Sequence, residues 1–253
     1  MAEWGRDGAL IAASAGGERY ALASPMEKRT GVLGGNVKRG ILIVFEGLDG
    51  CGKSTQLIRA AEMLRAEGHE IVVTREPTDG PWGRRIRSMA KNAEPVAPET
   101  ELEWFFEDRR EHMRDVVEPA LAAGKIVLSD RSYISTVAYQ GARGLDPAKI
   151  LAESEAQFAR PDRVLIFELS PEIGLGRVAT RGGVEEPAFE NLEFQQRVAE
   201  IFAQLDTLLG VEGLVRIDAD RCEEAIAKDV QRVLESCLAE AATSDRDDSR
   251  SEA

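Results

Sequence analysis

One short stretch, residues 41–55, constrains the fold of this 253-residue chain more than any other. Its first five residues, 41–45, are all apolar and predict a short strand buried on both faces. Residues 47–54 then fit the pattern G-x-x-x-x-G-K-[ST] at every fixed position. Glycines let such a loop point its N–H groups inward, and the N-terminus of a following helix attracts anions. The stretch therefore predicts a phosphate-binding P-loop.

We expect this loop to bind the phosphates of a nucleoside triphosphate. Lys53 supplies a positive charge for the β- and γ-phosphates, and the hydroxyl of Ser54 is expected to ligate Mg²⁺. Cys51 is interpreted as a small loop filler rather than as an oxidisable thiol. The residues expected around the phosphates are Gly47, Leu48, Asp49, Gly50, Cys51, Gly52, Lys53, Ser54 and Thr55.

The rest of the chain alternates between apolar segments of strand length and segments of helical period. This alternation predicts an α/β protein with a three-layer P-loop NTPase fold, in which helices flank a five-stranded parallel sheet. The predicted strands are residues 41–45, 70–74, 125–129, 163–169 and 213–218. The predicted helices are residues 56–67, 82–91, 98–123 with a break near Pro119, 171–181, 192–209 and 223–240.

Three regions follow from composition. Residues 1–38 are rich in Gly, Ala and Ser without periodicity and are expected to form a flexible extension, within which Met26 offers an alternative start. Residues 39–240 are expected to form one P-loop domain with a short lid near 181–191, and residues 241–253 are expected to be a disordered polar tail.

The net charge of −13 argues against nucleic acid as a partner, because nucleic-acid binding requires clustered Lys and Arg. The three cysteines form no C-x-x-C pair, which indicates a reduced, cytoplasmic setting. No apolar run reaches the roughly 18 residues of a membrane span, and the N-terminus lacks the pattern of a signal peptide, so no membrane association is expected.

Polar residues at the carboxyl ends of the strands are the next candidates, because ligands bind at that edge of an open parallel sheet. Arg75 and Glu76 follow the second predicted strand, although a polar turn with a surface ion pair is the alternative. Asp130 follows the third and is a candidate for the Mg²⁺ site with Ser54, with the steering of a neighbouring arginine as the alternative.

Two helical segments near these strands carry further candidates. Phe105 and Arg109 are four residues apart on one helix face, where they could stack on a base and hydrogen-bond its edge, with core packing as the alternative for Phe105. The arginines of residues 82–91 are expected to lie mostly on a solvated face.

Several motifs, taken in order and spacing, resemble those of the thymidylate kinases over residues 40–240. These enzymes transfer the γ-phosphoryl group of ATP to deoxythymidine monophosphate (dTMP). The matching motifs are Phe45-Glu46-Gly47-Leu48-Asp49-Gly50, Arg75-Glu76-Pro77, Phe105 with Asp108-Arg109 and His112, Asp130-Arg131 with Ser135-Thr136 and Ala138-Tyr139-Gln140-Gly141, and Arg160-Pro161-Asp162.

The resemblance implies roles for individual residues. Phe105 would stack on thymine and Arg109 would contact its edge, while Tyr139 would crowd the place of a ribose 2′-hydroxyl. The implied acceptor site consists of Asp49, Arg75, Glu76, Phe105, Arg109, Arg131, Ser135, Thr136, Tyr139 and Gln140. The family also implies ATP and dTMP as substrates, Mg²⁺ at Ser54 and Asp130, and a cytoplasmic homodimer.

The chain departs from the family at Ser132, where Tyr or Phe is usual, and in the lid, where Glu185 and Glu186 replace Asp-Arg. We therefore predict that Arg177 and Arg181, before the lid, supply charge to the transferring phosphoryl group together with Lys53 and Arg131. A related nucleoside or nucleotide kinase with a shifted acceptor, and a nucleotide-binding module with a degenerate lid, are the alternatives.

Overall fold

The computed structural model describes residues 2–4, 10–13, 19–21, 39–94, 96–181, 189, 191–207 and 210–251. For residues 2–4, 10–13, 19–21, 181 and 243–251 it describes the backbone alone. The lid that we predicted near 181–191 falls mostly outside this part of the chain.

A five-stranded sheet forms the centre of the molecule, and every neighbouring pair of its strands is parallel. The register sets Arg75 level with Asp130 and Asp130 level with Phe45, so the carboxyl ends of three strands meet at one edge. In spatial order the strands are β5 (Ile71–Arg75), β6 (Ile126–Asp130), β4 (Ile41–Gly47), β7 (Arg163–Glu168) and β8 (Leu214–Asp218).

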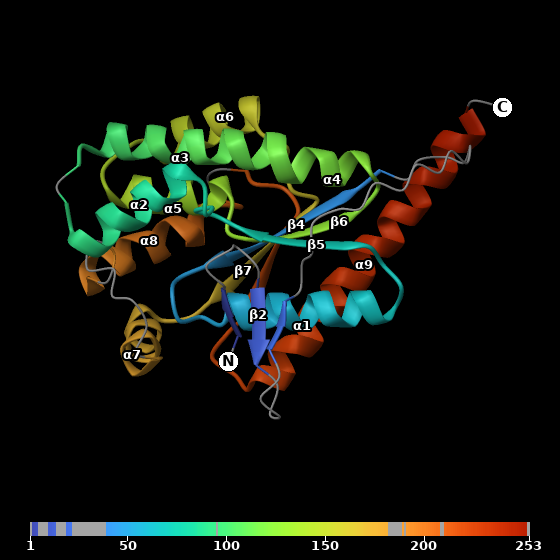
Figure 1. The fold of residues 1–253 in the computed structure, drawn as a ribbon, viewed down its shortest axis with the longest axis horizontal. Helices are drawn as coiled ribbons and strands as arrows, with labels where there is room; N and C mark the ends of the chain where they lie inside the picture. Colours follow the sequence, from blue (N-terminus) through green and yellow to red (C-terminus); the bar gives the residue numbers. More distant parts are fainter. Residues whose placement is uncertain are drawn as a thin grey trace.

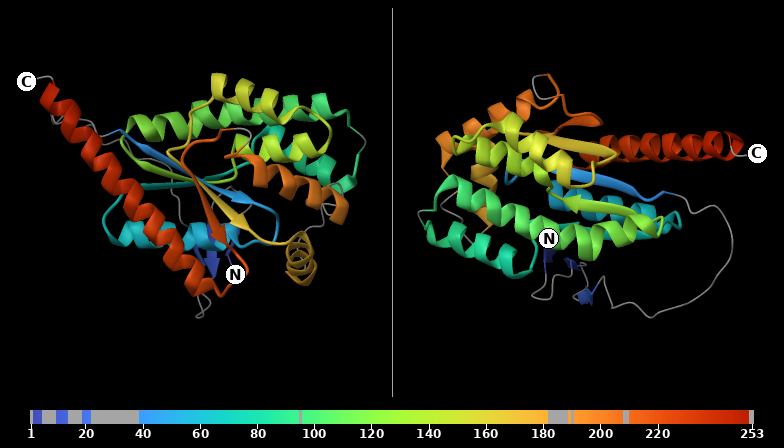
Figure 2. Two further views of the ribbon diagram at one scale, coloured as in Figure 1. Left: turned by 180° about the vertical axis from the view of Figure 1, so that it is seen from behind. Right: turned by 90° about the horizontal axis from the view of Figure 1, so that it is seen from above.

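Helices cover both faces of this sheet, which gives three layers (Figure 1). Two helices, α1 (Lys53–Ala66) and α9 (Glu223–Ser251), lie together on one face. The views of Figure 2 show α9 extending past the sheet toward the C-terminus. The remaining helical segments are α2 (Pro81–Asn92), α3 (Pro98–His112), a π-helical stretch (Met113–Val117), α4 (Glu118–Ala122), α5 (Tyr133–Ala142), α6 (Pro147–Gln157), α7 (Pro171–Arg181) and α8 (Leu192–Gln204).

The alternation of side chains along β4 explains why both faces are covered. Leu42 and Val44 belong to a core that includes residues of α2, α3, α5, α6 and α8. Ile41, Ile43 and Phe45 belong to a second core against α1 and α9. Burial of apolar side chains on both faces is the arrangement that continuous apolar strands require.

The predicted fold class is confirmed, and all five strands lie within two residues of their predicted bounds. Two helices were missed. The segment of α5 was not predicted as a helix, although Ser132 caps it by accepting a hydrogen bond from Ile134 N. The start of α6 carried a readable signal, because Asp146 caps the helix directly before Pro147.

Both ends of the chain contain regular structure that the sequence did not predict. Three short strands, β1 (Ala2–Trp4), β2 (Leu10–Ala13) and β3 (Arg19–Ala21), form a small antiparallel sheet within the expected extension. Helix α9 continues to Ser251, beyond the end that we predicted at residue 240. In the described ranges, no helix is both long enough and apolar enough to span a bilayer.

Candidate functional site

The predicted P-loop connects β4 to α1 and needs glycine for its geometry. Gly50 and Gly52 have φ angles of 79° and 93°, in the left-handed region. A Cβ at Gly50 would also lie 2.3 Å from the carbonyl oxygen of Gly174 on α7. Glycine at position 50 therefore allows the loop to pack directly against the backbone of α7.

Lys53, the first residue of α1, is buried, and its ammonium group lies inside this loop. Nζ donates to the carbonyl oxygens of Gly47, at 3.0 Å, and Leu48, at 2.7 Å. The first turn of α1 contains no acidic residue, so nothing there opposes the positive end of the helix dipole. The loop thus combines a lysine charge with a helix N-terminus, which is the arrangement that binds phosphate chains.

Three other residues of the loop differ in how they could contribute. Leu48 and Cys51 have buried side chains, so they can face a phosphate only through their backbone N–H groups. Thr55 is exposed at the start of α1.

Ser54 and Asp130 form a pair of oxygen ligands beside the loop. Ser54 Oγ donates to Asp130 Oδ2 at 2.5 Å, and this joins α1 to the end of β6. Among the described residues, no cluster of three or more metal-ligating side chains occurs. One carboxylate with a hydroxyl nevertheless fits Mg²⁺ in a nucleotide site, because phosphates and waters complete its coordination. The donor set is therefore compatible with the predicted metal.

Arg131 is the residue on which the P-loop, β6 and α5 converge. It follows β6 with a φ of 74°, a conformation that is uncommon outside glycine. Its Nη2 forms an ion pair with Asp49 at 2.5 Å, and its Nη1 donates to Ser135 Oγ at 2.8 Å. The guanidinium also lies 5.1 Å from the ring of Tyr139. Asp49 of the P-loop motif is thus brought together with Arg131, Ser135 and Tyr139 of the motif that begins at Asp130.

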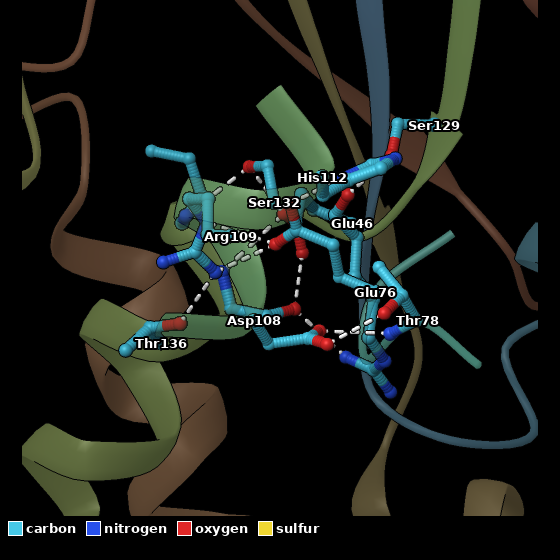
Figure 3. Close-up of polar contacts among 12 residues, drawn as sticks. Glu46, Glu76, Thr78, Asp108, Arg109, His112, Ser129, Ser132 and Thr136 are labelled. Atoms are coloured by element: carbon cyan, nitrogen blue, oxygen red, sulfur yellow. Dashed lines mark hydrogen bonds and ion pairs between the residues drawn. The ribbon is translucent and has the colours of Figure 1, made fainter. Parts of the chain in front are cut away.

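Beneath Arg131 lies Glu46, a fully buried carboxylate that we did not predict as a site residue. Its Oε2 accepts a hydrogen bond from Ser135 Oγ at 2.5 Å, and its Oε1 accepts one from Ser132 Oγ at 2.8 Å (Figure 3). Burial raises the pKa of Glu46, while Arg131 and the serine hydroxyls oppose the shift. The sequence could have indicated this residue, because Glu46 is an acidic residue that directly follows the apolar residues 41–45 of β4.

A basic group that includes the predicted Arg75 lies at the end of β5. Arg75 Nη2 and Arg87 Nη2 each contact Asp79 Oδ1 at 2.8 Å, and Arg87 Nη1 donates to Pro77 O at 2.9 Å. Arg84 and Arg85 are exposed, as we expected of most arginines in this helix, whereas Arg87 is partly buried and turns back toward the loop after β5. Its spacing of about one helical turn from the buried Gly83, near the start of α2, could have indicated this.

The face of α3 that we predicted to read a base lies against α5. Arg109 is 1% exposed, and its Nη2 donates to Thr136 Oγ1 at 2.8 Å. Gln140, one turn further along α5, donates from Nε2 to Glu101 Oε1 at 2.9 Å. Within the described part of the chain, Arg109 Nη1 and Gln140 Oε1 are buried and lack a hydrogen-bond partner. One hydrogen-bond donor on α3, Arg109 Nη1, and one acceptor on α5, Gln140 Oε1, are therefore available to a ligand.

The aromatic residues of this region divide between the core and the site. Phe106 belongs to the hydrophobic core, whereas Phe105 is half-buried and does not belong to it. Tyr139 packs edge-on against Phe189 and Phe194, with ring centroids 5.8 and 6.1 Å apart. Burial raises the pKa of Tyr139, so its hydroxyl stays protonated at neutral pH.

Arg177 lies between the P-loop and the segment after β8. Its Nη1 is 3.5 Å from Gly50 O and 3.4 Å from Ala219 O, and its Nη2 is 3.8 Å from Asp220 Oδ1. Arg181 ends α7, but its side chain falls outside the described atoms. The catalytic roles of both arginines stay predictions.

Comparisons with known proteins agree with this arrangement. The sequence model of the family "Thymidylate kinase" matches residues 45–230. A thymidylate kinase of Desulfotalea psychrophila is 44% identical over 167 residues, covering 66% of this chain and 82% of the relative. A thymidylate kinase of Xanthomonas euvesicatoria is 38% identical over 206 residues, covering 81% and 88%. A probable thymidylate kinase of Archaeoglobus fulgidus is 37% identical over 198 residues, covering 78% and 96%.

The matched region contains the P-loop, the Ser54–Asp130 pair, Arg131 and the face formed by α3 and α5. The relatives are matched over most of their own length as well. This chain belongs to the thymidylate kinase family.

Proposed function

We propose that this protein transfers the γ-phosphoryl group of ATP to dTMP, and that the deoxythymidine diphosphate it forms serves dTTP synthesis. Membership of the thymidylate kinase family supports the reaction class and both substrates. The site must bind three groups: the pyrimidine base of dTMP, its phosphate and the ATP that donates the phosphoryl group.

The observation that carries the acceptor assignment is that Arg109 Nη1, on α3, and Gln140 Oε1, on α5, are both buried without a hydrogen-bond partner among the described residues. A buried polar atom without a partner is costly, so such atoms point to a ligand contact. Thymine presents a matching edge, since its O4 accepts a hydrogen bond and its N3–H donates one. Cytosine presents the opposite pattern, an amino donor and an N3 acceptor, which would meet two mismatched groups.

We assign the acceptor phosphate to the arginines at the carboxyl ends of β5 and β6. Arg75 and Arg131 occupy these ends, and Arg87 joins Arg75 at Asp79. Such a concentration of guanidinium groups is notable in a chain with a net charge of −13. Guanidinium groups bind phosphate through parallel N–H donors, which also fixes its orientation.

In the proposed reaction an oxygen of the dTMP phosphate attacks the γ-phosphorus of ATP, and the bond from that phosphorus to the bridging oxygen breaks to release ADP. Lys53 neutralises negative charge on the leaving and transferring oxygens, and Arg131 orients the attacking phosphate. Mg²⁺, held by Ser54 and Asp130, would neutralise charge on the β- and γ-phosphates. No strong general base is required, because positioning and charge neutralisation carry most of the catalysis.

A coupled assay of ADP release with ATP and a panel of nucleoside monophosphates tests the proposal. We expect efficient turnover of dTMP, weaker turnover of dUMP, and little with dCMP, dAMP or dGMP. Chromatography should identify deoxythymidine diphosphate as the product, and the Lys53→Ala protein, purified in the same way, controls for contaminating kinases. Turnover of another monophosphate without turnover of dTMP would refute the assignment.

The family resemblance further supports a homodimer and a cytoplasmic location, both of which we propose. Light scattering on the purified protein checks the first, through a mass close to twice 27.7 kDa. Fractionation of cells that express the tagged protein checks the second.

A further inference from the structure

The guanidinium of Arg109 is held on two sides by protein groups. Its Nε and Nη2 contact the same oxygen of Glu76, Oε2, at 2.8 and 2.7 Å (Figure 3). Nη2 also donates to Thr136 Oγ1 at 2.8 Å. These contacts fix the plane of the guanidinium and leave Nη1 as its remaining donor. The direction in which Nη1 points therefore depends on Glu76.

Glu76 is itself oriented through its other oxygen. His112, three residues after Arg109 on α3, places Nδ1 at 2.8 Å from Glu76 Oε1. His112 is 3% exposed, and its Nε2 lies 2.6 Å from Thr74 Oγ1. A carboxylate only accepts hydrogen bonds, so Nδ1 carries a proton, and in the neutral ring Nε2 accepts from the threonine hydroxyl.

The charge state of Glu76 agrees with this arrangement. Burial by itself would raise the pKa of Glu76, but Arg109 and His112 outweigh that effect and lower it below its usual value. An ionised Glu76 has one oxygen for Arg109 and one for His112. Removal of either donor would leave a buried carboxylate oxygen without a partner.

We propose that His112 is a positioning residue for acceptor recognition: by holding Oε1 of Glu76, it keeps Oε2 against Arg109 and thereby aims Nη1 at the edge of the pyrimidine. This inference rests on the proposed function, because it assigns Nη1 to the base of dTMP. His112 touches neither substrate in this scheme and acts only through Glu76 and Arg109.

A purely structural role is the competing explanation, since His112 also ties α3 to β5. A neighbouring contact ties α3 to the loop that follows β5 without touching Glu76: Asp108 accepts from Thr78 N at 2.8 Å and from Thr78 Oγ1 at 2.6 Å. Thr78→Val removes one of these bonds and keeps the other. It therefore serves as a matched control for loosening of the same junction.

The variants are His112→Leu, which removes the donor to Glu76, and His112→Asn, whose amide nitrogen can take the place of Nδ1. We expect His112→Leu to raise KM for dTMP about tenfold or more, with kcat and KM for ATP within about twofold of wild type. His112→Asn should restore KM to within about threefold. Thr78→Val should lower the melting temperature without this change in KM.

A second readout separates positioning from stability. If Arg109 Nη1 reads the base, misaligning it should lower the ratio of kcat/KM for dTMP to that for dCMP, whereas partial unfolding lowers both values equally. In an Arg109→Leu background, adding His112→Leu should change KM for dTMP by less than about twofold, because the two residues act in one path. Thr74→Val removes the hydroxyl that contacts His112 Nε2 and should raise KM for dTMP by less than His112→Leu does. It replaces His112→Leu as the test variant if that protein fails to fold.

The outcomes distinguish this inference from the function on which it rests. Wild-type protein without dTMP turnover overturns both. Wild-type protein that phosphorylates dTMP, together with folded His112→Leu and Thr74→Val variants that keep KM and the dTMP to dCMP ratio, overturns the positioning role alone.

Discussion

Ser54 Oγ lies 2.5 Å from Asp130 Oδ2, and this contact joins the first turn of α1 to the carboxyl end of β6. The two residues are 76 positions apart in the chain. The parallel pairing of β4 with β6 brings them together, because it sets Phe45 level with Asp130. Two hard oxygen atoms thus lie side by side at the end of the phosphate loop.

Asp130→Asn should weaken the use of Mg²⁺, because an amide keeps the shape of the side chain and removes its charge. We expect the Mg²⁺ concentration for half-maximal rate to rise about tenfold and kcat at saturating Mg²⁺ to fall. A titration of the rate against Mg²⁺ at fixed ATP measures both. Asp115→Asn, on an exposed residue paired with Arg114, is the matched control. Equal Mg²⁺ dependence in the two variants would contradict the metal assignment.

Lys53→Ala should lower kcat by about a hundredfold or more, because it removes a charge aimed at the phosphates. The ammonium contributes two hydrogen bonds to loop carbonyls, so we expect the melting temperature to fall by only a few degrees. Steady-state kinetics and thermal unfolding check the two effects separately. A folded variant with near wild-type turnover would remove Lys53 from the mechanism.

Tyr139→Ala should relax discrimination against the ribonucleotide, because it opens space beside the sugar. We expect the ratio of kcat/KM for dTMP to that for its ribose analogue to fall about tenfold. Tyr139→Phe keeps the ring against Phe189 and Phe194 and should keep the ratio. If Tyr139→Ala leaves the ratio unchanged, the ring has a packing role alone.

Glu46→Gln should change how stability depends on pH. Burial raises the pKa of Glu46 above the ordinary value of 4.5, so the folded protein binds this proton more tightly than the unfolded chain. The contribution of Glu46 is therefore fully present below about pH 4.5 and is lost as the pH rises through the higher folded pKa. Denaturant unfolding at several pH values should show a shallower decline for Glu46→Gln than for wild type. Parallel curves would show that Glu46 titrates normally.

Much of this fold could be predicted because its signals are local. A buried strand such as residues 41–45 is recognisable from its apolar run, and the P-loop from its fixed spacing. Helix α6 was also predictable in principle from Asp146 and Pro147. The extension of α9 through Ser251 was not, since residues 241–251 offer no apolar stripe from which to infer a helix.

The site was predictable as a set of residues but not as a network. Motif spacing identifies Arg109 and Glu76, yet it does not indicate which oxygen of Glu76 meets which donor. The link from Glu46 through Ser135 to Arg131 depends on how α5 lies over β4. The contact of Ser135 with Glu46 joins residues 89 positions apart, and that of Arg131 with Asp49 joins residues 82 positions apart, so both arise only from tertiary packing.

Arg177 and Arg181 of α7 are the remaining candidates to supply the positive charge that an arginine in the lid would otherwise give to the transferring phosphoryl group. In the proposed reaction, the oxygens of the transferring γ-phosphoryl group would be stabilised by Lys53 and at least one guanidinium, together with the Mg²⁺ that Ser54 and Asp130 would hold. Arg177 already lies beside the P-loop, 3.5 Å from Gly50 O. Arg181 is one helical turn further along and is the last residue of α7. Both therefore lie on the helix that leads into the lid.

We expect Arg181→Ala to lower kcat by about a hundredfold or more, equivalent to roughly 2.7 kcal/mol, with little change in KM for dTMP. Arg177→Ala should have the same effect or a smaller one, because its guanidinium also contacts Ala219 O and Asp220. Arg114→Ala, at an exposed arginine paired with Asp115, is the control for loss of a surface charge. If both single variants and the double variant keep the kcat of that control, neither arginine stabilises the moving phosphoryl group, and the charge of the transition state is met by other residues.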